Sequence, residues 1–133
     1  MLALSALQLG LTPCLFDPDP QACGLMAGQS TSAPYSDQQA LQAFAQGLDV
    51  CTYEFENVPV EAAALVSTLC PLRPGLQALE VSQDRLSEKQ FLQSCGLTTT
   101  DFLPLQPGDP IPPGGLLKTR RLGYDGKGQG PDW

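Results

Sequence analysis

The chain has 133 residues, of which 42% are hydrophobic, and it carries a formal net charge of −7. This length allows one domain, or one domain and part of another. The acidic balance argues against a general nucleic-acid binder, which would show a basic face. The apolar opening lacks a basic leader and no run reaches eighteen apolar residues, so we expect a cytoplasmic protein without a membrane partner.

The five cysteines do not predict a disulfide framework or a metal site. They stand at wide, irregular spacing, none forms a C-x-x-C pair, and the chain has no histidine. We therefore expect buried free thiols, which behave as small hydrophobic side chains.

The beginning of the chain is predicted to alternate helix and strand. Apolar spacing over residues 1–9 predicts a helix, and residues 13–17 are typical of a buried strand. Residues 24–34 are rich in small residues and are expected to form a loop. Ser36 then opens a capping-box pattern, and a helical apolar stripe runs up to Gly47.

The next segments continue this alternation. Residues 49–57 alternate apolar and polar side chains, which predicts a strand with Glu54 and Glu56 on one face. Pro59 suits the first position of a following helix, and residues 72–74 predict a short strand. Alternating strands and helices favour a parallel α/β sheet.

The remaining chain is predicted to be more irregular. Residues 75–81 and 83–95 predict two helices, followed by an extended segment over residues 98–105. Residues 106–115 are too rich in proline and glycine for regular structure, and a short strand is expected to end at Lys118.

The stretch from Lys118 to Gly130 holds four of the seven basic residues and four of the thirteen glycines. A phosphate-binding loop needs glycines, whose backbone N–H groups can turn inward, and a cation to neutralise the oxyanions. The alternative is a solvated glycine-rich hairpin with scattered charge. The stretch is not a Walker sequence and does not open a helix.

Two further candidate clusters have ordinary structural explanations beside functional ones. Glu54 and Glu56 lie near the carboxyl end of a predicted strand, where open α/β sheets bind ligands, and could equally be exposed acids on an edge strand. Arg85 and Lys89 lie four residues apart on one helix face, which also suits a surface ion pair.

Three motifs resemble the 5-(carboxyamino)imidazole ribonucleotide synthase family of ATP-grasp enzymes. They are Thr52-Tyr-Glu-Phe-Glu-Asn-Val-Pro59, Gln83-Asp-Arg-Leu-Ser-Glu-Lys-Gln-Phe-Leu92, and Lys118-Thr-Arg-Arg with Gly123-Tyr-Asp-Gly-Lys-Gly-Gln129. The resemblance implies a truncated Rossmann-like parallel-sheet pre-ATP-grasp domain over residues 1–81, which lacks its first strand. Residues 82–133 would be the truncated start of an ATP-grasp nucleotide domain.

The resemblance also implies roles for residues that match the family's motifs. The expected ATP-binding residues are Arg85, Lys118, Gly123, Tyr124, Asp125, Gly126, Lys127, Gly128 and Gln129. Those expected near aminoimidazole ribonucleotide are Glu54, Tyr124 and Lys127. No catalytic residue and no metal ligand is assigned. The roles of Glu56, Lys89, Arg120 and Arg121 stay open, and residues 130–133 depart from the family pattern.

The implied reaction uses ATP, with Mg²⁺, and bicarbonate to carboxylate the exocyclic amine of aminoimidazole ribonucleotide in purine biosynthesis. The family is commonly homodimeric. Its magnesium ligands are expected outside this chain, so the 133 residues alone are expected to be inactive. Two alternatives stay open: an enzyme like the formate-dependent glycinamide ribonucleotide transformylase, and a non-catalytic α/β module that binds a nucleotide or a partner.

Overall fold

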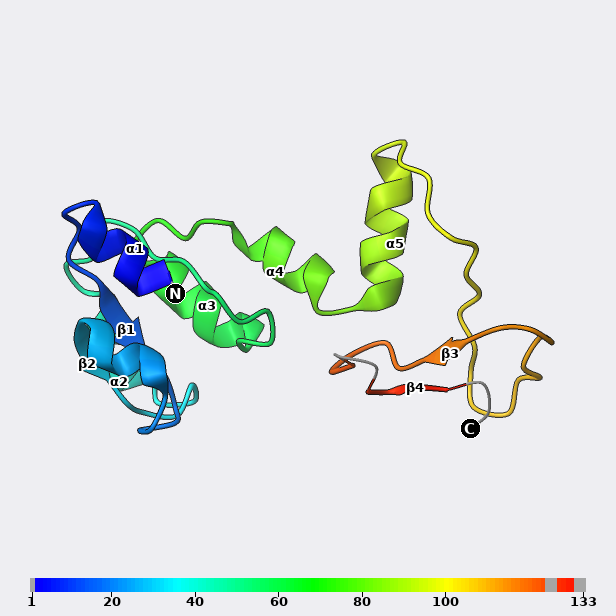
Figure 1. The fold of residues 1–133 in the computed structure, drawn as a ribbon, viewed down its shortest axis with the longest axis horizontal. Coiled ribbons are helices and arrows are strands. Elements are labelled where there is room, and N and C mark those ends of the chain that lie inside the picture. Colours follow the sequence, from blue (N-terminus) through cyan, green and yellow to red (C-terminus); the bar gives the residue numbers. More distant parts are fainter. Residues whose placement is uncertain (1, 124–126, 131–133) are drawn as a thin grey trace. The chain divides into compact units, whose positions relative to one another are not determined.

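The computed structural model describes residues 2–123 and 127–130. The chain divides into two compact units, Met1–Leu76 and Gln77–Trp133 (Figure 1). We call them unit 1 and unit 2 and describe each by itself.

Unit 1 begins with the predicted helix and strand, which are confirmed. Helix α1 covers Leu2–Gln8, and strand β1 covers Cys14–Phe16. The loop predicted for residues 24–34 is wrong in part, because this segment contains the 3-10 helix η1 (Cys23–Ala27) and strand β2 (Gln29–Thr31). β2 pairs in parallel with β1, and this tertiary pairing overrides the low strand propensity of its small and polar residues.

Two helices of unit 1 confirm predicted elements with corrected starting points. Helix α2 covers Gln38–Ala45, and its N-cap is Asp37 rather than Ser36, since the Asp37 carboxylate accepts from the N–H of Ala40 at 3.0 Å. Helix α3 covers Val60–Ser67, with Pro59 at its N-cap rather than at its first helical position.

The strand predicted for residues 49–57 is wrong. Only Cys51 makes a bridge, to Leu72, where the short predicted strand is likewise reduced to this one parallel contact. The backbone N–H of Cys51 donates to the carbonyl of Pro71 at 2.8 Å, and its carbonyl accepts from the N–H of Arg73 at 2.9 Å. The ladder cannot extend toward residue 49, because Pro71 has no N–H to donate. Alternation of side chains was present in this segment without a partner strand to stabilise it.

The core of unit 1 lies where α2 meets α3. Its buried members are Leu41, Ala45, Ala62, Val66 and Cys70. Phe16 of β1 packs against this cluster and contacts two further aromatic rings, stacked on Tyr35 at 5.8 Å and edge-on to Phe44 at 5.4 Å between centroids. Both strand contacts of unit 1 are parallel, so the predicted α/β class with a parallel sheet is confirmed.

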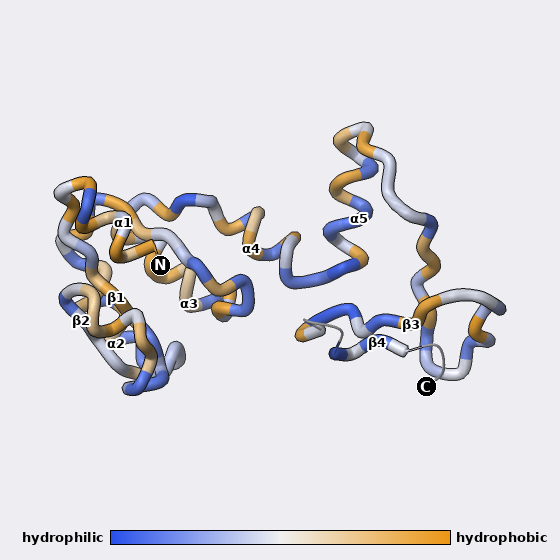
Figure 2. Tube along the Cα trace, viewed as in Figure 1, coloured by the Kyte–Doolittle hydropathy of each residue, from blue (hydrophilic) through white to orange (hydrophobic). Residues whose placement is uncertain are grey.

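The described residues of the second part of the chain form two helices and one small sheet. Helix α4 covers Leu76–Ser82 and helix α5 covers Arg85–Ser94, which confirms both predicted helices. The antiparallel strands β3 (Leu117–Lys118) and β4 (Gln129–Gly130) lie beyond an irregular stretch that begins after α5. Figure 2 colours the turn that follows β3 mostly hydrophilic.

No helix in the part of the chain that the structure describes is both long and apolar enough to cross a bilayer.

The described cysteines form no disulfide, as expected, but the expectation of burial is confirmed only for Cys70. Cys23 and Cys95 are exposed.

Candidate functional site

The glycine-rich stretch is held at its two ends as an antiparallel hairpin. β3 pairs with β4, with Lys118 opposite Gln129. Beyond the pair, the backbone N–H of Thr119 donates to the carbonyl of Gly128 at 2.8 Å. Lys118 is exposed. The hairpin interpretation and the phosphate-loop interpretation are therefore compatible, because the hairpin supplies a lysine at the entry to a glycine loop.

Two glycines of this loop pack against one threonine. Gly128 has φ +68°, and a Cβ placed on it would lie 2.4 Å from Oγ1 of Thr119. A Cβ on Gly123 would lie 2.9 Å from the same oxygen and 3.0 Å from the carbonyl oxygen of Lys127. These separations are below normal van der Waals contact, so a Cβ at either position would force a neighbouring group to move. The pattern of glycines thus reflects close packing as well as any ligand contact.

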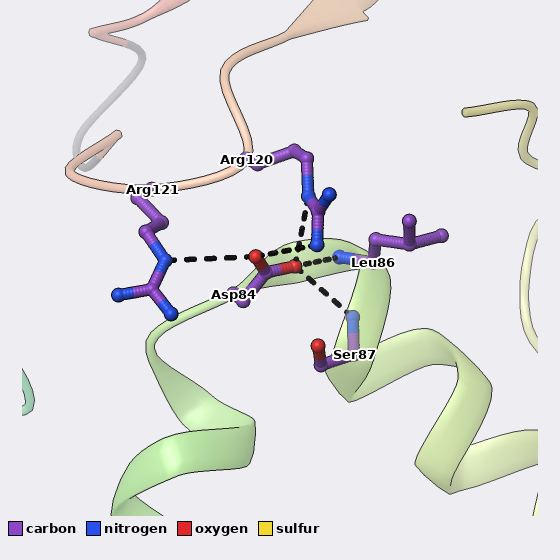
Figure 3. A network of polar contacts seen from close by, with 5 residues as sticks. All are labelled: Asp84, Leu86, Ser87, Arg120 and Arg121. Atoms are coloured by element: carbon purple, nitrogen blue, oxygen red, sulfur yellow. Dashed lines mark hydrogen bonds and ion pairs between the residues drawn. The ribbon is translucent and has the colours of Figure 1, made fainter. Parts of the chain in front are cut away.

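Asp84 joins the N-terminus of α5 to the segment that leads into the loop (Figure 3). Its Oδ1 accepts from the backbone N–H groups of Leu86 at 3.0 Å and Ser87 at 3.1 Å, and from Nε of Arg120 at 3.1 Å. Its Oδ2 lies 2.7 Å from Nη2 of Arg120 and 3.6 Å from Nε of Arg121. One carboxylate therefore caps a helix and pairs with two consecutive arginines.

Asp84 is buried, with 5% of its surface exposed, yet its pKa lies below its ordinary value. Burial alone would raise the pKa, because it disfavours the charged form. The hydrogen bond and charge of Arg120, with the N–H groups of Ser87 and Leu86, outweigh that effect. The carboxylate is therefore ionised at neutral pH, and Arg120 and Arg121 balance its negative charge.

Arg85 contacts the same segment. Its backbone N–H donates to the carbonyl of Arg120 at 2.9 Å, and its Nη2 donates to the carbonyl of Gly123. The structure thus brings one predicted ATP ligand beside the predicted loop. One nitrogen of the guanidinium already donates to the carbonyl of Gly123. The role of Arg85 as an ATP ligand stays a prediction.

Glu54, predicted to bind the ribonucleotide, lies in unit 1. It is exposed and sits in a bend, since the strand expected to carry it does not form. Glu56 is exposed as well, and its Oε1 accepts from Nδ2 of Asn57 at 3.5 Å. The placement on a strand face is therefore corrected, while the substrate role of Glu54 stays a prediction.

Three predicted loop residues, Tyr124, Asp125 and Gly126, lie outside the described residues. Lys127 is exposed in a turn just before Gly128. The proposed ligand contacts of all these residues stay predictions.

Lys89, left without a role by the sequence, has a structural one. Its Nζ donates to Oγ1 of Thr100 at 2.6 Å and to the carbonyl of the same residue at 3.3 Å. The same ammonium lies 5.4 Å from the ring centroid of Phe102, a cation–π contact. Lys89 thereby attaches the extended segment after α5 to the helix.

Residues 2–123 and 127–130 contain no group of three or more His, Cys, Asp or Glu side chains that could hold a metal ion. Asp84, for example, is already paired with Arg120 and Arg121. The described residues therefore offer no cluster of such ligands for Mg²⁺.

Two important residues of the site were not predicted from the sequence. Asp84 precedes α5 in the pattern Asp-x-x-Ser, and an aspartate before a helical stripe is a known N-cap signal. Its pairing with Arg120, 36 residues away, has no local signal. Thr119 carries none either, because its role depends on two glycines that approach it in space.

Comparison with known proteins agrees with this architecture. A family model for the ribonucleotide synthetase preATP-grasp domain matches residues 1–83. N5-carboxyaminoimidazole ribonucleotide synthase of Pseudomonas aeruginosa is 38% identical over 136 residues, which cover 97% of this chain and 38% of that protein. The chain therefore spans well under half the length of this relative.

Solved structures of similarly named proteins resemble the chain as well. N5-carboxyaminoimidazole synthetase of Staphylococcus aureus complexed with ADP has 31% identity and a TM-score of 0.83, covering 97% of this chain and 37% of that one. The Aspergillus clavatus synthase in complex with ADP and 5-aminoimidazole ribonucleotide has 25% identity and a TM-score of 0.59, covering 72% and 26%. The predicted resemblance is confirmed, and the chain belongs to the ribonucleotide synthetase preATP-grasp family.

Proposed function

We propose that this chain contributes the pre-ATP-grasp domain and part of the nucleotide site of an ATP-dependent carbon–nitrogen ligase. The complete enzyme would carboxylate the exocyclic amine of 5-aminoimidazole ribonucleotide in purine biosynthesis. The domains would be residues 1–81 and 82–133. The 133 residues alone would bind ligand without completing the reaction.

The observation that carries this proposal is the glycine-rich hairpin whose first strand ends at Lys118. It lies in a chain that is 38% identical to a carboxyaminoimidazole ribonucleotide synthase over 97% of this chain. Family membership and the name of that relative favour the ligase over the transformylase alternative. The ADP in the Staphylococcus aureus structure supports a nucleotide ligand.

In this proposal, Lys118 neutralises phosphate oxygens of ATP, and backbone N–H groups from Gly123 to Gln129 donate to the same phosphates. Catalysis of phosphoryl transfer depends mainly on such positioning and charge neutralisation. Arg85 would donate a further hydrogen bond to ATP, while its bond to the carbonyl of Gly123 holds the loop. Tyr124, Asp125, Gly126, Lys127 and Gly128 complete the proposed nucleotide loop.

The second substrate would be carboxylated in two steps. Bicarbonate takes the terminal phosphoryl group of ATP to give carboxyphosphate and ADP, and the amine nitrogen then attacks the carboxyphosphate carbon and releases phosphate. Glu54, Tyr124 and Lys127 would contact the ribonucleotide. Mg²⁺ would accompany the nucleotide on carboxylates outside this chain, and we assign none of its ligands here. We also propose a cytoplasmic location and a homodimeric complete enzyme.

The test is a calorimetric titration of the 133-residue chain with Mg·ATP. Replacing Lys118 with alanine removes a cation from a charge-assisted phosphate contact, so we expect affinity to fall by roughly tenfold or more. Arg73→Gln is the control for the loss of one positive charge, since Arg73 is not among the residues proposed to contact the nucleotide.

Arg73→Gln should leave the affinity unchanged. Equal affinity for the Lys118→Ala variant and the wild-type chain would contradict the assignment of Lys118. Undetectable binding by the wild-type chain at millimolar Mg·ATP would contradict the proposed nucleotide site in this chain.

A further inference from the structure

Arg120 and Arg121 stand next to the proposed phosphate loop, and consecutive arginines near such a loop suggest phosphate ligands. Their contacts indicate a different use. Arg120 donates to both oxygens of Asp84, and Nε of Arg121 lies 3.6 Å from the same carboxylate. Both arginine side chains are more than half exposed, whereas that of Asp84 is 8% exposed. The buried member of the cluster is thus the acid, and the two cations gather around it.

We call residues 120–123 the loop root. We infer that Asp84 is a positioning residue, which fixes the loop root to the N-terminus of α5 by holding Arg120 and Arg121. The inference deepens the proposed function and rests on it for its consequence in ligand binding. It also assigns the two arginines to the anchoring of the loop rather than to the phosphates of the nucleotide.

Three contacts connect α5 to the loop root within four residues of chain. The Asp84 carboxylate holds the two guanidinium groups, the N–H of Arg85 donates to the carbonyl of Arg120, and the Arg85 side chain donates to the carbonyl of Gly123. On the far side of the loop, Thr119 bonds Gly128 across the hairpin. The segment between Lys118 and Gly123 is therefore attached to a helix terminus and to Gly128, just before β4.

We call the pairing of Asp84 with Arg120 and Arg121 the clamp. One substitution can separate it from the helix-capping role of Asp84. In Asp84→Asn, the amide oxygen can still accept from Leu86 and Ser87, because asparagine is as good an N-cap as aspartate. The amide nitrogen cannot accept from Nη2 of Arg120 or Nε of Arg121, and the negative charge is lost, so only the bond from Nε of Arg120 to Oδ1 can remain. Asp37→Asn is the matched control: Asp37 caps α2 through the N–H of Ala40, and it is exposed.

The first readout is amide hydrogen exchange of the full 133-residue chain without ligand. Loss of charge-assisted bonds in Asp84→Asn should speed exchange at the N–H groups of Arg85 and Thr119 by roughly ten- to a hundredfold. Asp37→Asn should leave both rates within about twofold, as expected for a weak, distant effect. Equal rates in Asp84→Asn and the wild-type chain would overturn the inference.

A double-mutant cycle distinguishes the clamp from a structural role in the helix alone. In an Arg120→Gln/Arg121→Gln background, Asp84→Asn should add almost no further exchange, because the partners of the carboxylate are already gone. Full additivity would mean that Asp84 acts only through the helix cap, and would overturn the inference.

The second readout is the affinity for Mg·ATP by titration. Asp84→Asn should bind roughly tenfold more weakly than wild type if loop position sets affinity, whereas Asp37→Asn should bind equally. Tighter binding by Asp84→Asn would mean that the released arginines bind phosphate, and unchanged binding would mean that the clamp does not serve the site; either overturns the inference. If the wild-type chain does not bind Mg·ATP, the proposed function fails, and exchange still decides the clamp.

Discussion

Unit 1 and unit 2 are stabilised by different kinds of contact. In unit 1, α2 and α3 bury an apolar cluster, and the aromatic ring of Phe16 packs beside it. Among the described residues of unit 2, Leu79 is the buried hydrophobic side chain. Polar contacts of Asp84, Arg85 and Lys89 connect segments that lie apart in the sequence. We expect unit 1 to respond to changes in side-chain volume and unit 2 to changes in charge and backbone conformation.

Leu41→Ala should give the largest effect and confine it to unit 1. Leu41 is 4% exposed in the core cluster, and truncating a buried leucine removes apolar contacts and leaves a cavity, at a cost of about 3 kcal/mol in the free energy of unfolding. Hydrogen exchange should accelerate in α2 and α3 and stay unchanged in α5. Leu4→Ala is the control, because Leu4 is 52% exposed, and similar effects of both substitutions would contradict the assignment of the core.

Gly128→Ala should give a somewhat smaller effect, confined to unit 2. The new Cβ meets Oγ1 of Thr119, and the left-handed backbone disfavours alanine, so we expect a local cost of about 2 kcal/mol. Exchange at the Thr119 amide measures this cost. Gly114→Ala separates the two causes, because Gly114 has φ +75° but a Cβ added there would meet no atom within 4 Å.

In that comparison, Gly114→Ala should carry the backbone cost alone, about 1 kcal/mol. Adding Thr119→Ala to Gly128→Ala should recover part of the lost protection by removing the obstructing oxygen. Failure of this rescue would contradict the packing of Thr119 against Gly128.

The smallest effects should be those of pH, with opposite directions in the two units. The pKa of Asp84 is lowered on folding, so its contribution to unit 2 is complete above about pH 4 and is lost as the pH falls below that value. Burial, aided by Cys70, raises the pKa of Cys51 from 9.0 to about 11. The neutral thiol therefore stabilises unit 1 below about pH 9, and this contribution is lost as the pH rises from there toward about 11.

Protection factors corrected for intrinsic exchange, measured in α5 and α3 across this range, would check both directions. Asp84→Asn should flatten the acid response of α5. Cys51→Ala should reduce the alkaline response of α3, and part should remain because the pKa values of Cys70 and Tyr35 are also raised by burial. Equal responses of both units at both extremes would contradict the comparison.

Helices were predictable from the sequence where apolar spacing and caps agreed. The stripe before Gly47 and the helix after Pro59 both form, with boundaries that differ by a residue or two. The strand at residues 49–57 was not predictable from alternation, because a strand depends on a partner and Pro71 limits the pairing to one bridge. The strand at residues 29–31 was missed for the converse reason, since pairing with β1 creates it from small and polar residues.

The hairpin of the candidate site was predictable because its signal is local. Glycine recurrence and a preceding lysine indicated the loop, and the structure confirms that Lys118 and Gly128 belong to one hairpin. The Asp84–Arg120 pair joins residues 36 positions apart and could not be read from spacing. The family resemblance supplied the expected ligands, whereas the structure supplied the contacts that hold the loop.

We propose that the hairpin of β3 and β4, anchored on α5, forms part of a nucleotide site. Hydrogen exchange of the wild-type chain with and without saturating Mg·ATP tests it most directly, because a ligand that binds the folded state suppresses local opening. We predict slower exchange at the amides of Arg85, Thr119 and residues 127–130, with no change in α2 and α3. Unchanged exchange at these amides, or protection confined to unit 1, would contradict the claim.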